Sequence, residues 1–336
     1  MQDIDNLSKV IEASDQRRSH RRQFLRYAGA ATATVGGLTL LSACGGDDDD
    51  DVAVAPTPTP TATAAPIGDA DILNFALQLE YLEAQFYSYA AFGTGLAATL
   101  LTGTGTQGAV VTGGTAGPRQ VTFTDPVVAQ YAREIAADEI AHVAFLRSAL
   151  GAASAAQPAI NISGDATGSF TAAARAAGVV PATGTFDPYA DDNNFLLGAY
   201  IFEDVGVTAY KGAAPLISNK VILEAAAGIL AAEAYHAGLI RTILYRKGLE
   251  APQLRTIAGQ ISDARDSLDG ASDLDQGITG TATVSNIVPV DGNAIAFSRT
   301  TGQVLNIVYL NRAAVTMGGF FPAGVNGTIR TSAASG

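Results

Sequence analysis

The chain has 336 residues, of which 48% are apolar, so it can bury a sizeable core as one large domain or two ordinary ones. Its formal net charge is −12 at pH 7, and this acidic balance argues against nucleic-acid binding and against electrostatic docking on anionic lipid. A single cysteine, Cys44, excludes an intramolecular disulfide, while metal cations and small or neutral partners stay compatible with the composition.

The first segment resembles a twin-arginine export signal. Arg21 and Arg22 are followed after one residue by Phe24 and Leu25, and residues 27–46 carry no charge. The alternative is a transmembrane anchor, for which the length nearly suffices. The content of Gly and Thr argues against an anchor, so we predict export by the twin-arginine machinery.

The end of this segment resembles a bacterial lipoprotein box. Leu41-Ser42-Ala43-Cys44 places the only cysteine of the chain at the position that is lipidated in such proteins. The alternative is a plain signal cleaved at a small-residue site. We expect residues 1–43 to be removed and Cys44 to carry lipid. The protein would then be held in the periplasm or at the cell surface, with a lipid anchor as its only membrane contact.

A tether follows, over residues 44–67. It contains an Asp run and then alternating Pro and Thr, a composition that cannot build a core and stays extended and solvated. The Asp run could also bind cations weakly, but a solvated spacer is the simpler interpretation.

Helical periodicity and end signals predict four long helices in the rest of the chain. They cover residues 69–92, Asp125-Pro126 to about 150, Asp191 or Asp192 to about 212–215, and a Ser218 cap to Lys247 with Gly248 as the stop. A long polar segment after residue 150 holds one short predicted helix at about 170–177. The fold class we predict is all-α: an antiparallel four-helix bundle over residues 68–250 with long inserts.

Each predicted helix has one apolar or small-residue stripe with the spacing that faces a bundle interior. Near its middle, each stripe carries a carboxylate: Glu80, Glu139, Glu203 and Glu233. The second and fourth helices also carry a histidine three residues after the glutamate, at His142 and His236. The first and third carry a tyrosine seven residues after it, at Tyr87 and Tyr210. Two helix pairs therefore share one layout, which predicts a bundle with pseudo-twofold symmetry.

Four ionised carboxylates in one dry core need compensating charge. Two divalent cations would balance them, and residues three apart on a helix point the same way, so each Glu-x-x-His could offer a bridging carboxylate and a terminal imidazole. This donor set suits iron or manganese in redox work and also zinc. The alternative is a pair of buried Glu–His hydrogen bonds in a bundle without metal.

Three further assignments are less determined by the pattern. Glu83 lies one turn from Glu80 and could be a metal ligand, a nearby base or an ion-pair partner of Arg133. Tyr87 and Tyr210 could hydrogen-bond the ligand carboxylates or simply be core tyrosines. Glu134 and Asp138 lie off the stripe and are expected to face solvent or neighbouring helices.

At this point the chain resembles the ferritin-like superfamily of di-metal carboxylate proteins, and within it the desiccation-related group. The resemblance rests on "ILNFALQLEYLEAQFY" at 72–87, "VSNIVPVDGNAIAFSRTTGQVLNIVYLN" at 284–311 and "GGFFPAGVNG" at 318–327, and it covers about residues 68–327. It implies a four-helix bundle that binds two iron or manganese ions. By matching positions, it implies these ligands: Glu80, Glu139, His142, Glu203, Glu233 and His236. It implies no settled activity.

The C-terminal part, residues 251–336, is predicted to be a mixed, irregular extension. We expect a strand-like piece at 283–289, a short helix at about 300–310 and a Gly-rich turn around Phe320 and Phe321. This extension could pack on its own bundle or mediate self-association into a homo-oligomer, and the first is favoured.

Two functions follow from the pattern. The leading one is an exported redox protein that oxidises ferrous ion, or consumes peroxide or oxygen, at a di-iron or di-manganese centre in envelope stress protection. The second is non-enzymatic: a desiccation-related or stress-related bundle that binds metal for stability or sequestration. A closed iron-storage cage fits poorly with a lipid tether and long inserts, and no Ser/His/Asp layout of a hydrolase is visible.

Overall fold

The computed structural model describes residues 66–335. The predicted export signal with Arg21 and Arg22, the lipid site at Cys44 and nearly all of the tether lie outside the described residues and stay predictions. Within 66–335, no helix combines the length and the hydrophobicity needed to cross a bilayer.

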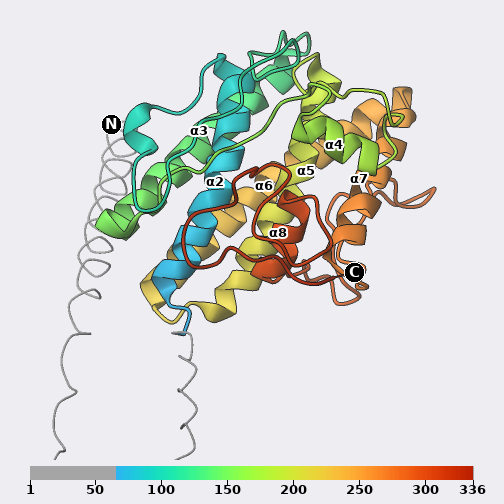
Figure 1. The fold of residues 1–336 in the computed structure, drawn as a ribbon. Helices are drawn as coiled ribbons and strands as arrows, with labels where there is room; N and C mark the ends of the chain where they lie inside the picture. Colours follow the sequence, from blue (N-terminus) through green and yellow to red (C-terminus); the bar gives the residue numbers. More distant parts are fainter. Residues whose placement is uncertain (1–65, 336) are drawn as a thin grey trace, which may run out of the picture. The chain divides into compact units, whose positions relative to one another are not determined.

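The described residues form a helical bundle with short additional helices around it (Figure 1). The helices are α2 (Asp69–Phe92), α3 (Pro126–Leu150), α4 (Ser169–Ala176), α5 (Asp192–Ala213), α6 (Lys220–Glu250), α7 (Gln253–Asp269) and α8 (Thr301–Val308). Three single-turn helices, at 98–100, 151–153 and 214–216, follow α2, α3 and α5. The long helices α2, α3, α5 and α6 are the four predicted ones, so the predicted all-α bundle is confirmed.

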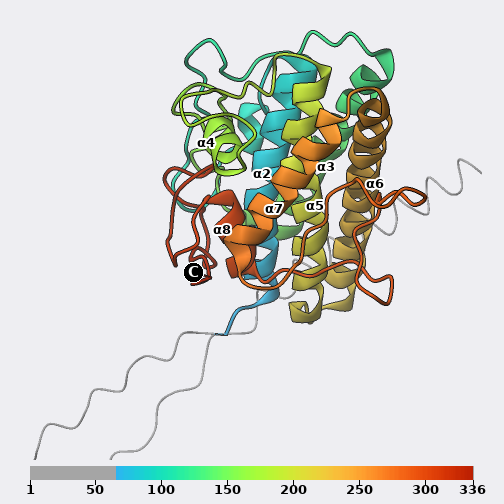
Figure 2. The ribbon, with the colours of Figure 1, turned by 90° about the vertical axis from the view of Figure 1, so that its right-hand side faces the viewer.

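The long helices pair α2 with α3 and α5 with α6, and α2 also packs on α5. Figure 2 shows α7 lying along α5, with α8 and the C-terminal segment beside it. As a result α2 and α5 are buried on nearly every side, whereas α3 and α6 bury only one stripe. The apolar residues all round α2 and α5 are typical of helices enclosed in this way.

Local side chains explain where the helices begin. Asp125, Asp191 and Asn219 each accept hydrogen bonds from two backbone N–H groups of the following turn, which satisfies donors that a helix start leaves unpaired. The prediction that Ser218 caps α6 is wrong. The Ser218 hydroxyl instead contacts Asp69 in the first turn of α2, and its neighbour Asn219 takes the capping position.

The predicted stop at Gly248 is also wrong, because α6 continues through it to Glu250. A side-chain carbon at Gly248 would lie 2.4 Å from Cγ of Arg255 in α7. Glycine is therefore required here by the close approach of α7 and not by a helix end. The helix α7 itself was not predicted.

The predicted strand at 283–289 is absent, and the only β-bridge of the described residues near it joins Val290 and Ala296. The backbone oxygens of Asn286 and Ile287 accept hydrogen bonds from the buried guanidinium of Arg241 instead of from a neighbouring strand. The short helix predicted at 300–310 is α8, where Thr300 and Gln303 form a capping box.

Candidate metal centre

Six side chains from the four long helices meet in the interior of the bundle. α2 contributes Glu80 and α5 contributes Glu203, while α3 and α6 each contribute a Glu-x-x-His pair. Their potential ligand atoms fall into two groups, each within 4.8 Å. One group is Glu80, Glu139, His142 and Glu233; the other is Glu139, Glu203 and His236. Glu139 is common to both groups, as expected of a bridging carboxylate.

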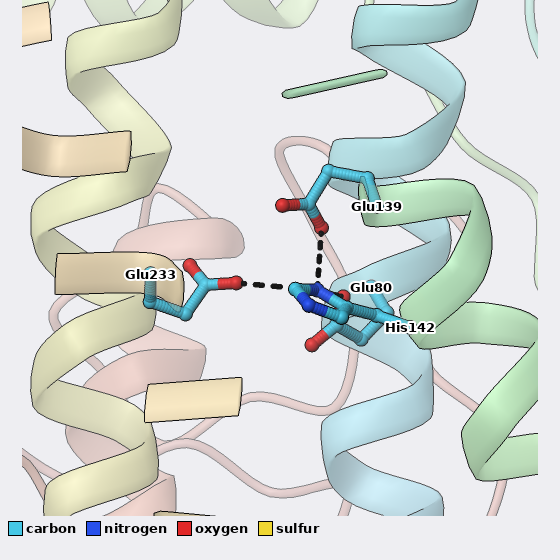
Figure 3. Close-up of side chains that lie close together, drawn as sticks. All are labelled: Glu80, Glu139, His142 and Glu233. Atoms are coloured by element: carbon cyan, nitrogen blue, oxygen red, sulfur yellow. Dashed lines mark ion pairs between the residues drawn. The ribbon is translucent and has the colours of Figure 1, made fainter. Parts of the chain in front are cut away.

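In the first group, three carboxylates surround one ring nitrogen of His142. Its Nδ1 lies 3.2 Å from Oε2 of Glu80, 3.5 Å from Oε2 of Glu139 and 3.7 Å from Oε1 of Glu233. Figure 3 shows these four side chains pointing toward one another from three helices. Glu80, Glu139 and Glu233 are fully buried, so this arrangement of negative charge is shielded from water.

In the second group, His236 takes the corresponding place. Its Nδ1 lies 3.1 Å from Oε1 of Glu139 and 3.7 Å from Oε2 of Glu203. Its other ring nitrogen, Nε2, lies 3.2 Å from Oδ2 of Asp138 on α3. The sequence pattern placed Asp138 off the stripe, facing solvent or a neighbouring helix; its contact with His236 in particular was not predicted.

Two buried tyrosines hold the outer carboxylates, and each reaches from one helix pair to the other. Tyr87 of α2 donates to Oε1 of Glu203 on α5, and Tyr210 of α5 donates to Oε1 of Glu80 on α2. The predicted hydrogen bonds exist, but each tyrosine serves the glutamate of the opposite helix. Each carboxylate keeps its second oxygen, Oε2, directed at the histidines.

The donor atoms of these six residues have no hydrogen-bond partner of their own. They account for eight of the fourteen buried side-chain nitrogen and oxygen atoms without such a partner in the described residues. They are Oε2 of Glu80, both oxygens of Glu139 and Glu233, Oε2 of Glu203, and Nδ1 of His142 and His236. Buried polar atoms are normally satisfied, and leaving one unpaired costs about 1–3 kcal/mol. Eight such atoms converging on one place fit a site for cations bound by oxygen and imidazole.

Burial and mutual repulsion raise the pKa of three of the carboxylates, whereas neighbouring imidazoles lower that of Glu139. Burial raises the pKa of Glu80 to about 7 and that of Glu203 to about 8. Burial, and then the charge of Glu139, raises the pKa of Glu233 well above its usual value. Burial also acts to raise the pKa of Glu139, but the two imidazoles beside it outweigh burial and lower it to about 2. Without metal, Glu139 is therefore the carboxylate of the four that most readily keeps its charge, because it lies between the two imidazoles.

The histidines show the complementary shift. Burial acts to lower the pKa of both, but Glu80 and Glu139 raise that of His142 to about 11. Glu203 and Glu139 likewise raise that of His236 to about 9. At neutral pH without metal, both rings therefore carry a proton on the nitrogen that would bind a cation.

We therefore expect metal binding to release protons and to strengthen as pH rises. Each Nδ1 must lose its proton before it can ligate, so apparent affinity should rise roughly tenfold per pH unit for each proton released, up to the pKa of His236. Calorimetric titration with Mn²⁺ at about pH 6.5 and 8.5, in two buffers of different ionisation enthalpy, measures both quantities. Equal affinity at both pH values, with no proton release, would contradict this protonation of the metal-free site.

Glu83 lies beside the centre but belongs to neither group of donors. Burial, followed by the charges of Glu139 and Glu203, raises its pKa well above the usual value. The alternative pairing with Arg133 is not seen, since that guanidinium donates to the backbone oxygen of Ala129. On α5, Gly206 stands at the offset from Glu203 that Glu83 has from Glu80. An added carbon there would lie 2.3 Å from Oε2 of Glu233 and 3.5 Å from Oε1 of Glu83.

We expect Gly206→Ala to weaken metal binding without unfolding the chain. The new methyl group would meet the flexible end of Glu233, which can move, and alanine favours a helix over glycine by up to about 1 kcal/mol. The displaced ligand should lower metal affinity by roughly 10–100-fold, the range found for lost ligand support. Gly228→Ala on α6 is the matched control, because nothing lies within 4 Å of its added carbon. Unchanged metal affinity in Gly206→Ala, measured by calorimetry, would show that Glu233 is not needed in its present position.

The comparisons with known proteins agree with this geometry. The family model of the ferritin-like domain matches residues 68–246, which hold α2, α3, α5 and most of α6. The chain belongs to the ferritin-like family. This ferritin-like chain is similar to the ferritin-like catalase Nec2 of Nesocodon mauritianus, with 29% identity over 280 residues, covering 78% of this chain and 84% of that protein. It is also similar to the desiccation-related protein PCC13-62 of Craterostigma plantagineum, with 31% identity over 253 residues, covering 71% of this chain and 77% of that protein. No solved structure matches the chain.

These findings confirm the resemblance to the ferritin-like superfamily and its desiccation-related group. The ferritin-like chain holds carboxylate and histidine clusters that could bind a metal ion. That the six residues named above are its ligands, and that two ions bind, stay predictions.

Proposed function

We propose that this ferritin-like protein binds two iron or manganese ions between α2, α3, α5 and α6 and uses them for redox chemistry. The observation that carries the proposal is the set of eight buried donor atoms without hydrogen-bond partners, supplied by four glutamates and two histidines. Two divalent ions would match the charge of the four carboxylates, and the imidazole and carboxylate donor set suits iron or manganese.

The favoured reaction is the breakdown of hydrogen peroxide. The name of one relative, ferritin-like catalase Nec2, is the reason to prefer peroxide over ferrous ion or dioxygen. Two molecules of hydrogen peroxide yield two of water and one of dioxygen, so peroxide is both oxidant and reductant. The bound ions would supply the electron exchange. The chain's own part would be to hold the donors through Tyr87 and Tyr210 and to exclude bulk water from the centre.

The test is turnover by the full chain loaded with Mn²⁺ or Fe²⁺. After removal of excess metal, about two ions per chain and dioxygen release from peroxide would support the proposal. His142→Ala should lose that turnover, because it removes the ring nitrogen around which the first group of donors is built. A folded, metal-loaded chain that leaves peroxide, ferrous ion and dioxygen unchanged would refute the redox function.

A second candidate is a non-enzymatic, desiccation-related role in which metal stabilises or is stored in the bundle. Two observations favour it: a relative named as a desiccation-related protein, and the complete burial of four glutamates that leaves little access for a substrate. In that case metal removal should lower the melting temperature while turnover is absent from the start.

We further propose that the protein is exported by the twin-arginine machinery and anchored by lipid at Cys44, in the periplasm or at the cell surface. The Arg21-Arg22 pair and the position of the only cysteine support this. Its partners would be metal ions and small oxidants, and the C-terminal extension could also serve a homo-oligomer. Mass spectrometry of the chain from a bacterial envelope fraction tests the anchor: a diacylglyceryl group on Cys44 would support it, and an unmodified Cys44 in a mature chain would refute it.

A further inference from the structure

The centre departs from twofold symmetry at the residue that precedes each Glu-x-x-His pair. In the repeated layout, Glu139 corresponds to Glu233 and His142 to His236. The residue before Glu139 is Asp138, but the residue before Glu233 is Ala232. Only one of the two corresponding positions can therefore offer a hydrogen-bond acceptor.

The carboxylate of Asp138 contacts the histidine of the other helix pair, His236. Its Oδ2 lies 3.2 Å from Nε2 of His236, while Nδ1 of the same ring faces Glu139 and Glu203. The Asp138 side chain is 49% exposed, whereas the ring of His236 is 4% exposed. A surface carboxylate on α3 thus reaches an interior ring on α6.

For His142 the surroundings differ. Its ion pairs with the described residues are all made by Nδ1, toward Glu80, Glu139 and Glu233. Its side chain is 13% exposed, about three times as much as that of His236. Ala232, the counterpart of Asp138, has no polar atom on its side chain with which to hold the outer ring nitrogen.

We propose that Asp138 is a positioning residue for His236, and that it makes the two metal positions of the centre unequal. A ring that donates Nε2–H to a carboxylate must keep its lone pair on Nδ1, which is the nitrogen facing Glu139 and Glu203. The carboxylate also fixes the ring's orientation and makes Nδ1 a stronger donor. The ring of His236 has this support, whereas none of the described residues forms an ion pair or hydrogen bond with Nε2 of His142. This inference rests on the proposed metal centre.

The histidine content of the chain makes a direct test possible. The full chain has three histidines, His20, His142 and His236, and His20 lies outside the described residues. Long-range ¹H–¹⁵N spectra of the ¹⁵N-histidine chain, loaded with diamagnetic Zn²⁺, show which ring nitrogen holds the proton. A His20→Gln variant removes the third signal set. We expect His236 to hold its proton on Nε2 in a single form, with Nδ1 bound to Zn²⁺.

Three variants separate positioning from folding. Asp138→Ala should remove the single Nε2-protonated form of His236 and weaken one of the two Zn²⁺ ions by roughly 10–100-fold, with the other unchanged. Asp138→Asn keeps an oxygen that can accept from Nε2–H, so it should retain the tautomer and lie between wild type and Asp138→Ala in affinity. Glu134→Ala is the control, because it removes one negative charge from an exposed position one turn earlier on α3. It should change neither the tautomer of His236 nor the Zn²⁺ affinities.

The outcomes are distinct. Wild-type Zn²⁺ binding with an unchanged His236 spectrum and unchanged affinities in Asp138→Ala would overturn the inference and leave the metal centre standing. Equal weakening of both ions in Asp138→Ala would also overturn it, since the effect would not be confined to the His236 position. Absence of Zn²⁺, Mn²⁺ and Fe²⁺ binding by the folded wild type would overturn the proposed function and the inference together.

Discussion

Replacing Glu139 with alanine is expected to abolish metal binding at both positions at once. Glu139 is the one residue shared by both groups of donors, and both of its oxygens are free of hydrogen bonds. Glu80→Ala should be milder, because it removes a ligand from one group alone. Loss of a bridging ligand should exceed the roughly 10–100-fold loss of affinity that supporting residues typically cause.

Elemental analysis of the purified chain and calorimetry with Mn²⁺ or Fe²⁺ measure this effect. Circular dichroism must accompany them, because Glu139→Ala also leaves two buried imidazoles without the carboxylate that lies between them. Glu139→Gln keeps the size of the side chain and should lose metal in the same way while disturbing packing less. Two ions per chain in a folded Glu139→Gln variant would refute the bridging role.

The largest effect on stability is expected from Arg299→Ala. The Arg299 guanidinium is fully buried, bonds Oδ2 of Asp269 at 2.5 Å and also contacts Asp275 and Thr208. Burial raises the pKa of Asp269 and Asp275, so both depend on neighbouring arginines to stay ionised. Removing one partner of a buried ion pair typically costs about 3–5 kcal/mol, because the remaining charge is left uncompensated.

Urea unfolding in the presence of a chelator measures this loss apart from any contribution of metal. Arg246→Ala is the control: its ion pair with Asp125 spans 3.5 Å and its side chain is 59% exposed, so about 0–1 kcal/mol is expected. A loss of 1 kcal/mol or less for Arg299→Ala would mean that packing alone holds the C-terminal segment to α5 and α7. Arg299 precedes α8 and joins α5, through Thr208, to Asp269 at the end of α7.

Much of the bundle could be read from local patterns. The bounds of α2 and α3 agree with the predicted helices. The start of α3 was predictable because Asp125 and Pro126 are start signals that act within one turn. The end of α6 could not be predicted in this way. Gly248 resembles a stop, and only the approach of Arg255 from α7 explains why a glycine lies inside the helix. The irregular segment at 283–289 could not be predicted either, because its backbone oxygens accept hydrogen bonds from Arg241, more than forty residues earlier in the chain.

For the candidate site too, some features follow from local sequence and others from the packing of the helices. Spacing along each helix by itself determined which glutamates and histidines face the bundle interior, because the helical repeat sets the direction of a side chain relative to its neighbours. Contacts between helices depend on how the helices pack, and the sequence pattern holds no such information. Only the tertiary structure therefore decided that Tyr87 serves Glu203, that Tyr210 serves Glu80, and that Asp138 reaches His236.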